Sequence, residues 1–218
     1  MSDNQSQNES NLNFTVMPVG FLQCNCTVVV EKDSKKALVF DPGGHVDQII
    51  SATKDAGGEE IVGIYCTHAH ADHIMGVGEL KEKTGATVYM CERDLKLWDD
   101  VDQQCRKFGL PTDFTKVKPD VFISEGDETC LGNAKVLHTP GHSPGSVSFY
   151  FEEAGVIIVG DVLFRHSIGR TDLWGGSQST LFSSIREKIF TLPPKTQIVT
   201  GHGPFTSVGD EINGNPFL

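Results

Sequence analysis

The sequence lacks a long apolar run, and it lacks an excess of positive charge. No stretch approaches the roughly 20 apolar residues that a membrane-spanning helix needs. Lysine and arginine number 18 against 29 aspartate and glutamate, which gives a formal net charge of −11 at pH 7. Because such a surface repels phosphate groups, we expect neither nucleic acid nor an anionic membrane as a partner.

Cysteine is present, but without the spacing of a metal-binding or disulfide motif. The six cysteines include no CxxC pair and do not form the pattern of a small disulfide scaffold. Residues 1–11 contain neither the basic region nor the apolar region of a secretory signal. These absences predict a cytoplasmic protein with a disordered polar segment at residues 1–12 and a single domain at 13–218.

Short β-rich runs alternate with amphipathic segments along the rest of the chain. We predict strands at residues 14–19, 26–30, 37–40, 61–66, 86–90, 121–123, 134–138, 146–151, 156–159 and 197–200. Helices are predicted at about 46–56, after residue 74 and at 180–190, with a broken helix at 92–108. This order of strands and helices predicts an α/β fold in which two packed sheets carry helices on the outside.

The most informative stretch is His68-Ala-His70-Ala-Asp72-His73, which directly follows a predicted buried strand. Open α/β sheets carry their binding sites at such carboxyl ends of strands. Residues two apart on an extended turn point the same way, so His68 and His70 can hold one ion as a pair. Asp72 and His73, at the start of the following helix, point elsewhere and can serve a second ion.

Three further potential ligands each lie just past a predicted strand, with glycine beside them. They are His142, Asp161 and His202. A single histidine in a turn is usually an exposed residue without a functional role. The same placement at three strand ends, beside the first cluster, indicates a metal centre. Five histidines and two aspartates suffice for two ions that share one carboxylate, with a position left for water. Imidazole and carboxylate without thiolate suit Zn, Fe or Mn, and two divalent ions would attract an anionic intermediate.

This pattern resembles the metallo-β-lactamase superfamily and, within it, the short single-domain type of glyoxalase II. The seven residues above carry the resemblance, together with Asp41-Pro42-Gly43 and the stretch 167–172. The resemblance implies an αβ/βα four-layer sandwich with two mixed sheets and a dinuclear site at one edge. It assigns His68, His70 and His142 to one metal and Asp72, His73 and His202 to the other, with Asp161 bridging.

The resemblance implies a hydrolase that acts on small-molecule thioesters similar to S-lactoylglutathione. Its cofactors would be two divalent ions, Zn above all, with Fe or Mn also compatible. Asp72 and Asp161 are the predicted catalytic residues. Longer glyoxalase II enzymes hold glutathione with a C-terminal helical domain, whereas only sixteen residues follow His202. We therefore expect weak binding of S-lactoylglutathione, that is, a high Michaelis constant.

Two other functions remain open. One is a persulfide dioxygenase with a single iron on His68, His142 and Asp161, because that group of the same fold shares the stretch 169–172. The other is a metal-dependent binding module without turnover, which would usually have lost a ligand, and none is missing here. The oligomeric state, monomer or homodimer, is also left open.

The residues around the ligands have predicted supporting roles. Asp41 and Asn25 are expected to contact ligating imidazoles, and Arg170 is expected to pair with Asp172. Three histidines without partners at ligand spacing are expected at the surface or behind the ligands: His45, His138 and His166. Cys24 and Cys26 share one strand face, where buried packing is the expected role.

Overall fold

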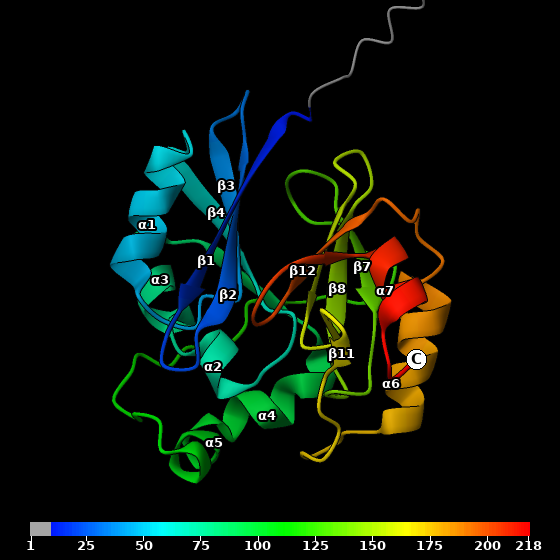
Figure 1. Ribbon diagram of the computed structural model, residues 1–218. Coiled ribbons are helices and arrows are strands. Elements are labelled where there is room, and N and C mark those ends of the chain that lie inside the picture. The colour runs from blue at the N-terminus through cyan, green and yellow to red at the C-terminus, as the bar shows by residue number, and fades with distance from the viewer. Residues whose placement is uncertain (1–9) are drawn as a thin grey trace, which may run out of the picture.

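The computed structural model describes residues 10–218, whose strands form two large sheets that face each other (Figure 1). The first sheet has the order β1-β2-β3-β4-β5-β6, with β1 (Leu12–Val19), β2 (Cys24–Glu31), β3 (Lys36–Phe40), β4 (Glu60–Tyr65), β5 (Thr87–Met90) and β6 (Val121–Phe122). The second has the order β13-β12-β9-β8-β7, with β7 (Lys135–His138), β8 (Val147–Phe151), β9 (Val156–Gly160), β12 (Gln197–Thr200) and β13 (Thr206–Ser207).

Both sheets are mixed. In the first sheet β1, β2 and β3 pair antiparallel, whereas β3, β4, β5 and β6 run parallel. In the second sheet β12 runs parallel to β9, and the other pairs are antiparallel. The parallel pairs bring the carboxyl ends of several strands to the same edge of each sheet, and that edge carries the candidate ligands.

Helices cover the outer face of each sheet. The described helices are α1 (Val46–Asp55), α2 (Ala71–Ile74), α3 (Val77–Thr84), α4 (Leu95–Asp99), α5 (Val101–Phe108), α6 (Gln178–Ser184) and α7 (Val208–Gly214), with the short segments η1 (Glu92–Asp94) and η2 (Ile185–Ile189), and α4 and α5 lie at the lower edge of the sandwich in Figure 1. In Figure 1, α1 and α3 lie outside the first sheet, and α6 and α7 outside the second. Over residues 10–218, no helix has the length and apolar character needed to cross a membrane.

Successive side chains along a strand point alternately toward the outer helices and toward the space between the two sheets. On β3, Ala37 and Val39 pack toward the helices of the first half, whereas Phe40 packs toward the second sheet. On β9, Ile158 faces the same central core and Ile157 faces α6 and η2. Strands buried on both faces have nearly continuous apolar sequences, which explains why the runs are so apolar. The helix–sheet–sheet–helix arrangement confirms the predicted four-layer sandwich.

Several short elements differ from the prediction. The hairpin of β10 (Leu163–Phe164) and β11 (Ser167–Ile168), strand β13 and helix α7 were not expected from the sequence. Helix α7 contains two glycines, which disfavour a helix, but the Ser207 side chain accepts a hydrogen bond from Asp210 N (3.1 Å) and caps it. Of the segment predicted to be disordered, residues 1–9 lie outside the described part, and β1 begins at Leu12.

Candidate metal centre

All seven predicted ligands come together at one edge of the sandwich. The first sheet contributes the loop and helix after β4, with His68, His70, Asp72 and His73. The second sheet contributes three loops, with His142 after β7, Asp161 directly after β9 and His202 after β12. Each sheet therefore supplies part of the cluster, and the two halves of the chain must pack correctly before it can form.

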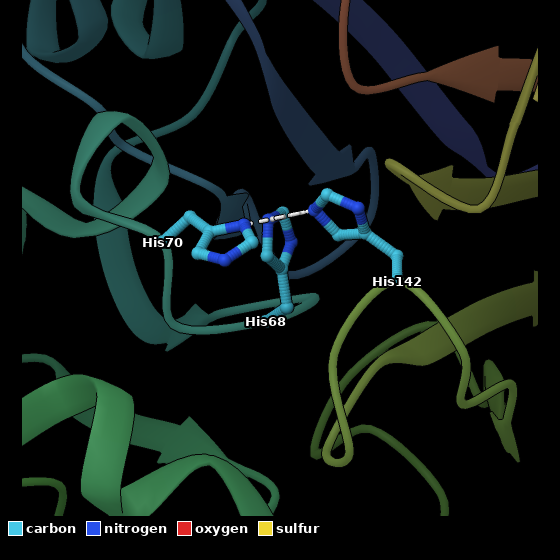
Figure 2. A group of neighbouring side chains, drawn as sticks. All are labelled: His68, His70 and His142. Carbon is cyan, nitrogen blue, oxygen red and sulfur yellow. Dashed lines mark hydrogen bonds between the residues drawn. The ribbon is translucent and has the colours of Figure 1, made fainter. Parts of the chain in front are cut away.

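Three histidines form a first group. His142 Nε2 lies 2.8 Å from His70 Nδ1 and 3.3 Å from His68 Nε2. Figure 2 shows the rings of His70 and His142 facing each other from separate loops, with His68 between them. All three side chains are buried. Their ring nitrogens converge closely enough for one ion to contact all of them.

Asp72, His73 and His202 form a second group. His202 Nε2 lies 3.1 Å from Asp72 Oδ2 and 3.3 Å from His73 Nε2. His73 is fully buried, whereas Asp72 and His202 are partly exposed to the cleft. This group can also hold one ion.

Asp161 lies between the two groups. Its Oδ1 atom is 3.4 Å from His73 Nε2, and its Oδ2 atom is 3.7 Å from His142 Nε2. Gly201 lets the carboxylate approach, because a Cβ atom there would overlap Oδ1. Oδ1 is buried yet accepts no hydrogen bond from any residue in the described range 10–218. A buried carboxylate oxygen without a partner, facing imidazole nitrogens, fits a cation-binding site.

Hydrogen bonds behind the rings determine which nitrogen faces the cluster. His142 Nδ1 donates to the carbonyl of Arg170 (2.8 Å), and His73 Nδ1 donates to Asp41 Oδ2 (3.0 Å). Since a carbonyl and a carboxylate can only accept, the proton is on Nδ1 in both rings. Nε2 of each ring therefore faces the cluster, as a metal ligand requires.

The predicted role of Asp41 is found, whereas that of Asn25 needs correction. Besides His73, Asp41 binds Thr67, accepting from its backbone N–H and its hydroxyl, both at 2.7 Å. Asn25 contacts no imidazole. Its side-chain amide donates to the carbonyls of Thr200 and Gly203, both at 2.9 Å, so it holds the turn around His202 through the backbone.

The electrostatics separate the two groups. Burial lowers the pKa of His70 to about 3 and that of His68 well below its usual value, so both rings are neutral at pH 7. Burial opposes the charged form of His73 as well, but the neighbouring carboxylates of Asp161 and Asp72 raise its pKa well above the usual value. Burial also opposes ionisation of Asp161, yet His73 and His142 hold its pKa far below the usual range. An ion at the second group would therefore replace bound protons.

Sequence reasoning missed Asp94, a buried residue at the end of η1 that directly precedes α4. Its carboxylate accepts from the backbone N–H groups of Ala69 (3.1 Å) and Gly145 (2.6 Å) and from the Ser143 hydroxyl (2.6 Å). Asp94 thereby connects the loop of His68 and His70 to the loop of His142. No pattern distinguishes it from the other acidic residues of a charged segment, so only the three-dimensional structure reveals it.

We expect Asp94→Asn to weaken the centre without touching a ligand. Whichever way the amide is turned, its NH2 group faces a backbone N–H and a hydrogen bond is lost, which costs about 1–3 kcal/mol of unfolding free energy. Metal affinity should fall roughly 10–100-fold because the two loops lose their connection. Urea denaturation and metal titration measure both effects. The exposed Asp99→Asn is the matched control, and equal behaviour of the two variants would contradict the role of Asp94.

The other predicted neighbours lie outside the cluster. Arg170 forms the predicted ion pair with Asp172, through two hydrogen bonds of 2.7 and 2.8 Å. His138 Nε2 donates to the carbonyl of Pro144 (2.9 Å), and neither His45 nor His166 reaches the cluster. Cys24 and Cys26 are buried as expected, and the Cys24 sulfur also lies 3.3 Å from His73 Nδ1.

Residues 19–202 match the sequence model of a protein family, the metallo-beta-lactamase superfamily. The chain belongs to this superfamily. Within it, the chain is 42% identical to a probable metallo-hydrolase, YqgX, of Bacillus subtilis, covering 93% of this chain and 95% of that one. It is 36% identical to the hydroxyacylglutathione hydrolase GloC of Haemophilus influenzae, covering 95% of this chain and 98% of that one.

Solved structures of the superfamily superpose on the chain. BLEG-1, a B3 metallo-beta-lactamase, has a TM-score of 0.86 at 39% identity, covering 94% of this chain and 99% of that one. TTHA1623, in a di-iron-bound form, has a TM-score of 0.85 at 37% identity, with 94% and 100% covered. ETHE1 from Myxococcus xanthus has a TM-score of 0.75 at 26% identity, with 94% and 83% covered. The chain is thus a metallo-hydrolase-type domain whose histidine–aspartate cluster suits divalent metal.

Proposed function

We propose that the chain is a dinuclear metal-dependent hydrolase of thioesters similar to S-lactoylglutathione. In this proposal His68, His70 and His142 hold one ion, and Asp72, His73 and His202 hold the other. Asp161 bridges the two. The observation that carries the proposal is the position of Asp161, which presents one carboxylate oxygen to each of two complete ligand groups.

In the reaction, water adds to the thioester carbonyl carbon and the carbon–sulfur bond then breaks, giving a carboxylic acid and a thiol. Divalent ions at the two groups would lower the pKa of water and polarise the carbonyl. A cleft of about 320 Å3, lined by Asp72, His142, Asp161 and His202 among others, gives the substrate access. Asp72, partly exposed in this cleft, orients the attacking water through its carboxylate.

Zinc is the metal we propose, with iron or manganese compatible with the same ligands. The donors are imidazole and carboxylate, and the described cluster contains no thiolate among its seven members. Cys24 lies behind His73 and is protonated, because burial raises the pKa of its thiol to about 12. The di-iron-bound form of TTHA1623 supports a centre of two ions.

The similarity to ETHE1 fits the second candidate, a persulfide dioxygenase with one iron on His68, His142 and Asp161. Such a centre has no use for the second group, yet Asp72, His73 and His202 converge as closely as a ligand set does. The 36% identity to GloC, against 26% to ETHE1, also supports the hydrolase.

Metal analysis joined to a substrate panel tests the proposal. The protein is purified without added metal and assayed with S-lactoylglutathione, with glutathione persulfide under oxygen, and with a β-lactam because of the similarity to BLEG-1. We expect two metal equivalents and thioester hydrolysis. A single iron, oxygen uptake with persulfide and no thioester hydrolysis would overturn the hydrolase in favour of the dioxygenase.

A further inference from the structure

A second and larger cavity lies beside the cleft of the metal centre. It has a volume of about 610 Å3 and is bounded by residues of α4 and α5 on one side and by Leu173 and Trp174 on the other. The cleft and this cavity share four lining residues: His70, Gln104, Phe108 and Leu173. A molecule that reaches the metal centre can therefore extend from the cleft directly into this cavity, which we call the α5 groove.

The charge of the α5 groove is opposite to that of the whole protein. Lys96, Arg106 and Lys107 line it against a single acidic residue, Asp100, although acidic residues outnumber basic ones 29 to 18 in the chain. Asp100 neutralises Lys96 at 2.7 Å. Arg106 forms no ion pair with any described residue, so its charge is available to a ligand.

The walls of the groove are apolar near the metal centre. Leu97, Phe108, Leu173 and Trp174 lie along it, and Phe108 and Trp174 remain 40% and 49% exposed. Exposed aromatic side chains beside a cleft are typical of a surface that binds the stem of a ligand. The groove thus combines an apolar wall with cationic groups, which matches a chain that has methylene or peptide segments and negatively charged ends.

We propose that the α5 groove binds an anionic chain carried by the thioester substrate, with Arg106 and Lys107 as specificity-determining residues. This proposal rests on the thioester hydrolase function and adds the substrate class. A protein of net charge −11 repels anions at long range, and a local patch of opposite sign beside the cleft raises the rate at which an anionic substrate is captured. The anionic groups are carboxylates or phosphates, on either the thiol or the acyl side.

Four thioesters distinguish whether the groove recognises an anionic group on the thiol side or on the acyl side. Acetyl-N-acetylcysteamine is neutral, acetyl-glutathione and acetyl-coenzyme A place carboxylates or phosphates on the thiol, and succinyl-N-acetylcysteamine places a carboxylate on the acyl group. We expect at least one anionic thioester to exceed the neutral one in kcat/KM by about tenfold or more, because a charged cleft raises capture rates by roughly 10–10³. This preference should decrease as salt rises.

The double variant Arg106→Glu/Lys107→Glu should remove most of this preference, measured as the ratio of the two kcat/KM values. The control is Lys54→Glu/Lys195→Glu, which changes the net charge equally at exposed positions outside the groove and should keep the ratio. Thermal melts confirm that both variants fold, and Arg106→Gln/Lys107→Gln gives an intermediate ratio. Two results would overturn the groove proposal alone and leave the thioester function standing. One is thioester hydrolysis without a preference for anionic substrates, and the other is a preference that the groove variants leave unchanged. No hydrolysis of the four thioesters or of S-lactoylglutathione overturns the thioester function and the groove proposal together.

Discussion

Replacement of Asp72 by alanine is expected to remove about one metal equivalent and to lower thioester hydrolysis by roughly a hundredfold or more. Asp72 Oδ2 is 3.1 Å from His202 Nε2 and belongs only to the second ligand group. Losing one Lewis acid removes several kcal/mol of transition-state stabilisation, and each 1.4 kcal/mol is about tenfold in rate. Metal content and steady-state kinetics on the purified variant measure both losses.

The same variant distinguishes the two candidate functions. A single iron on His68, His142 and Asp161 does not involve Asp72, so Asp72→Ala would keep that iron and most of its oxygen uptake with glutathione persulfide. Asp33→Ala, at an exposed turn far from the cluster in sequence, controls for the loss of a carboxylate as such. Circular dichroism confirms that the fold is retained. Full metal content with unchanged hydrolysis in Asp72→Ala would contradict the dinuclear proposal.

The convergence of the ligands could be predicted from the sequence because each ligand follows a buried strand. Apolar runs such as residues 156–159 locate the strands, and the strand ends then locate Asp161 and His202. Glycine beside these positions is a visible signal for close approach, and Gly201 shows why, since a side chain there would displace Asp161. Local sequence was informative here because strand order and site position are linked in this type of fold.

The support behind the ligands could not be predicted in the same way. Asp94 and Gly145 are 51 positions apart, and their hydrogen bond depends on how α4 packs against the other half of the protein. Neither residue belongs to a pattern within its own segment. Asn25 is predicted to contact an imidazole, but its partners are backbone carbonyls at the end of β12 and in the turn that follows. Side-chain contacts across elements follow from packing, which local periodicity does not specify.

The α5 groove could not be predicted from the sequence for a related reason. The sequence predicts a broken surface helix at 92–108, where charged residues alternate with apolar ones. Only the fold shows that Arg106 and Lys107 line the same cavity as Leu173 and Trp174, which come from the loop that follows the β10–β11 hairpin. Binding residues on segments that are distant in sequence thus form one surface next to His70.

Asp161→Asn is expected to have the largest effect of any single substitution at the centre. The aspartate offers a negatively charged oxygen to each ligand group, whereas asparagine offers one neutral oxygen and an NH2 group that repels a cation. Both ions should therefore bind more weakly, with total content below one equivalent after dialysis and hydrolysis reduced by roughly a thousandfold or more.

A double-variant cycle with Asp72→Ala makes this test sharper. If Asp161 serves both ions, removing Asp72 after Asp161 costs far less activity than removing it first, because the second ion is already weakly held. If instead Asp161 serves the first group alone, the two losses multiply. An Asp161→Asn protein that keeps two equivalents and activity within tenfold of the wild type would show that the bridging role is wrong. The position of Asp161, with Oδ1 toward His73 and Oδ2 toward His142, leads us to expect the strongly non-additive result.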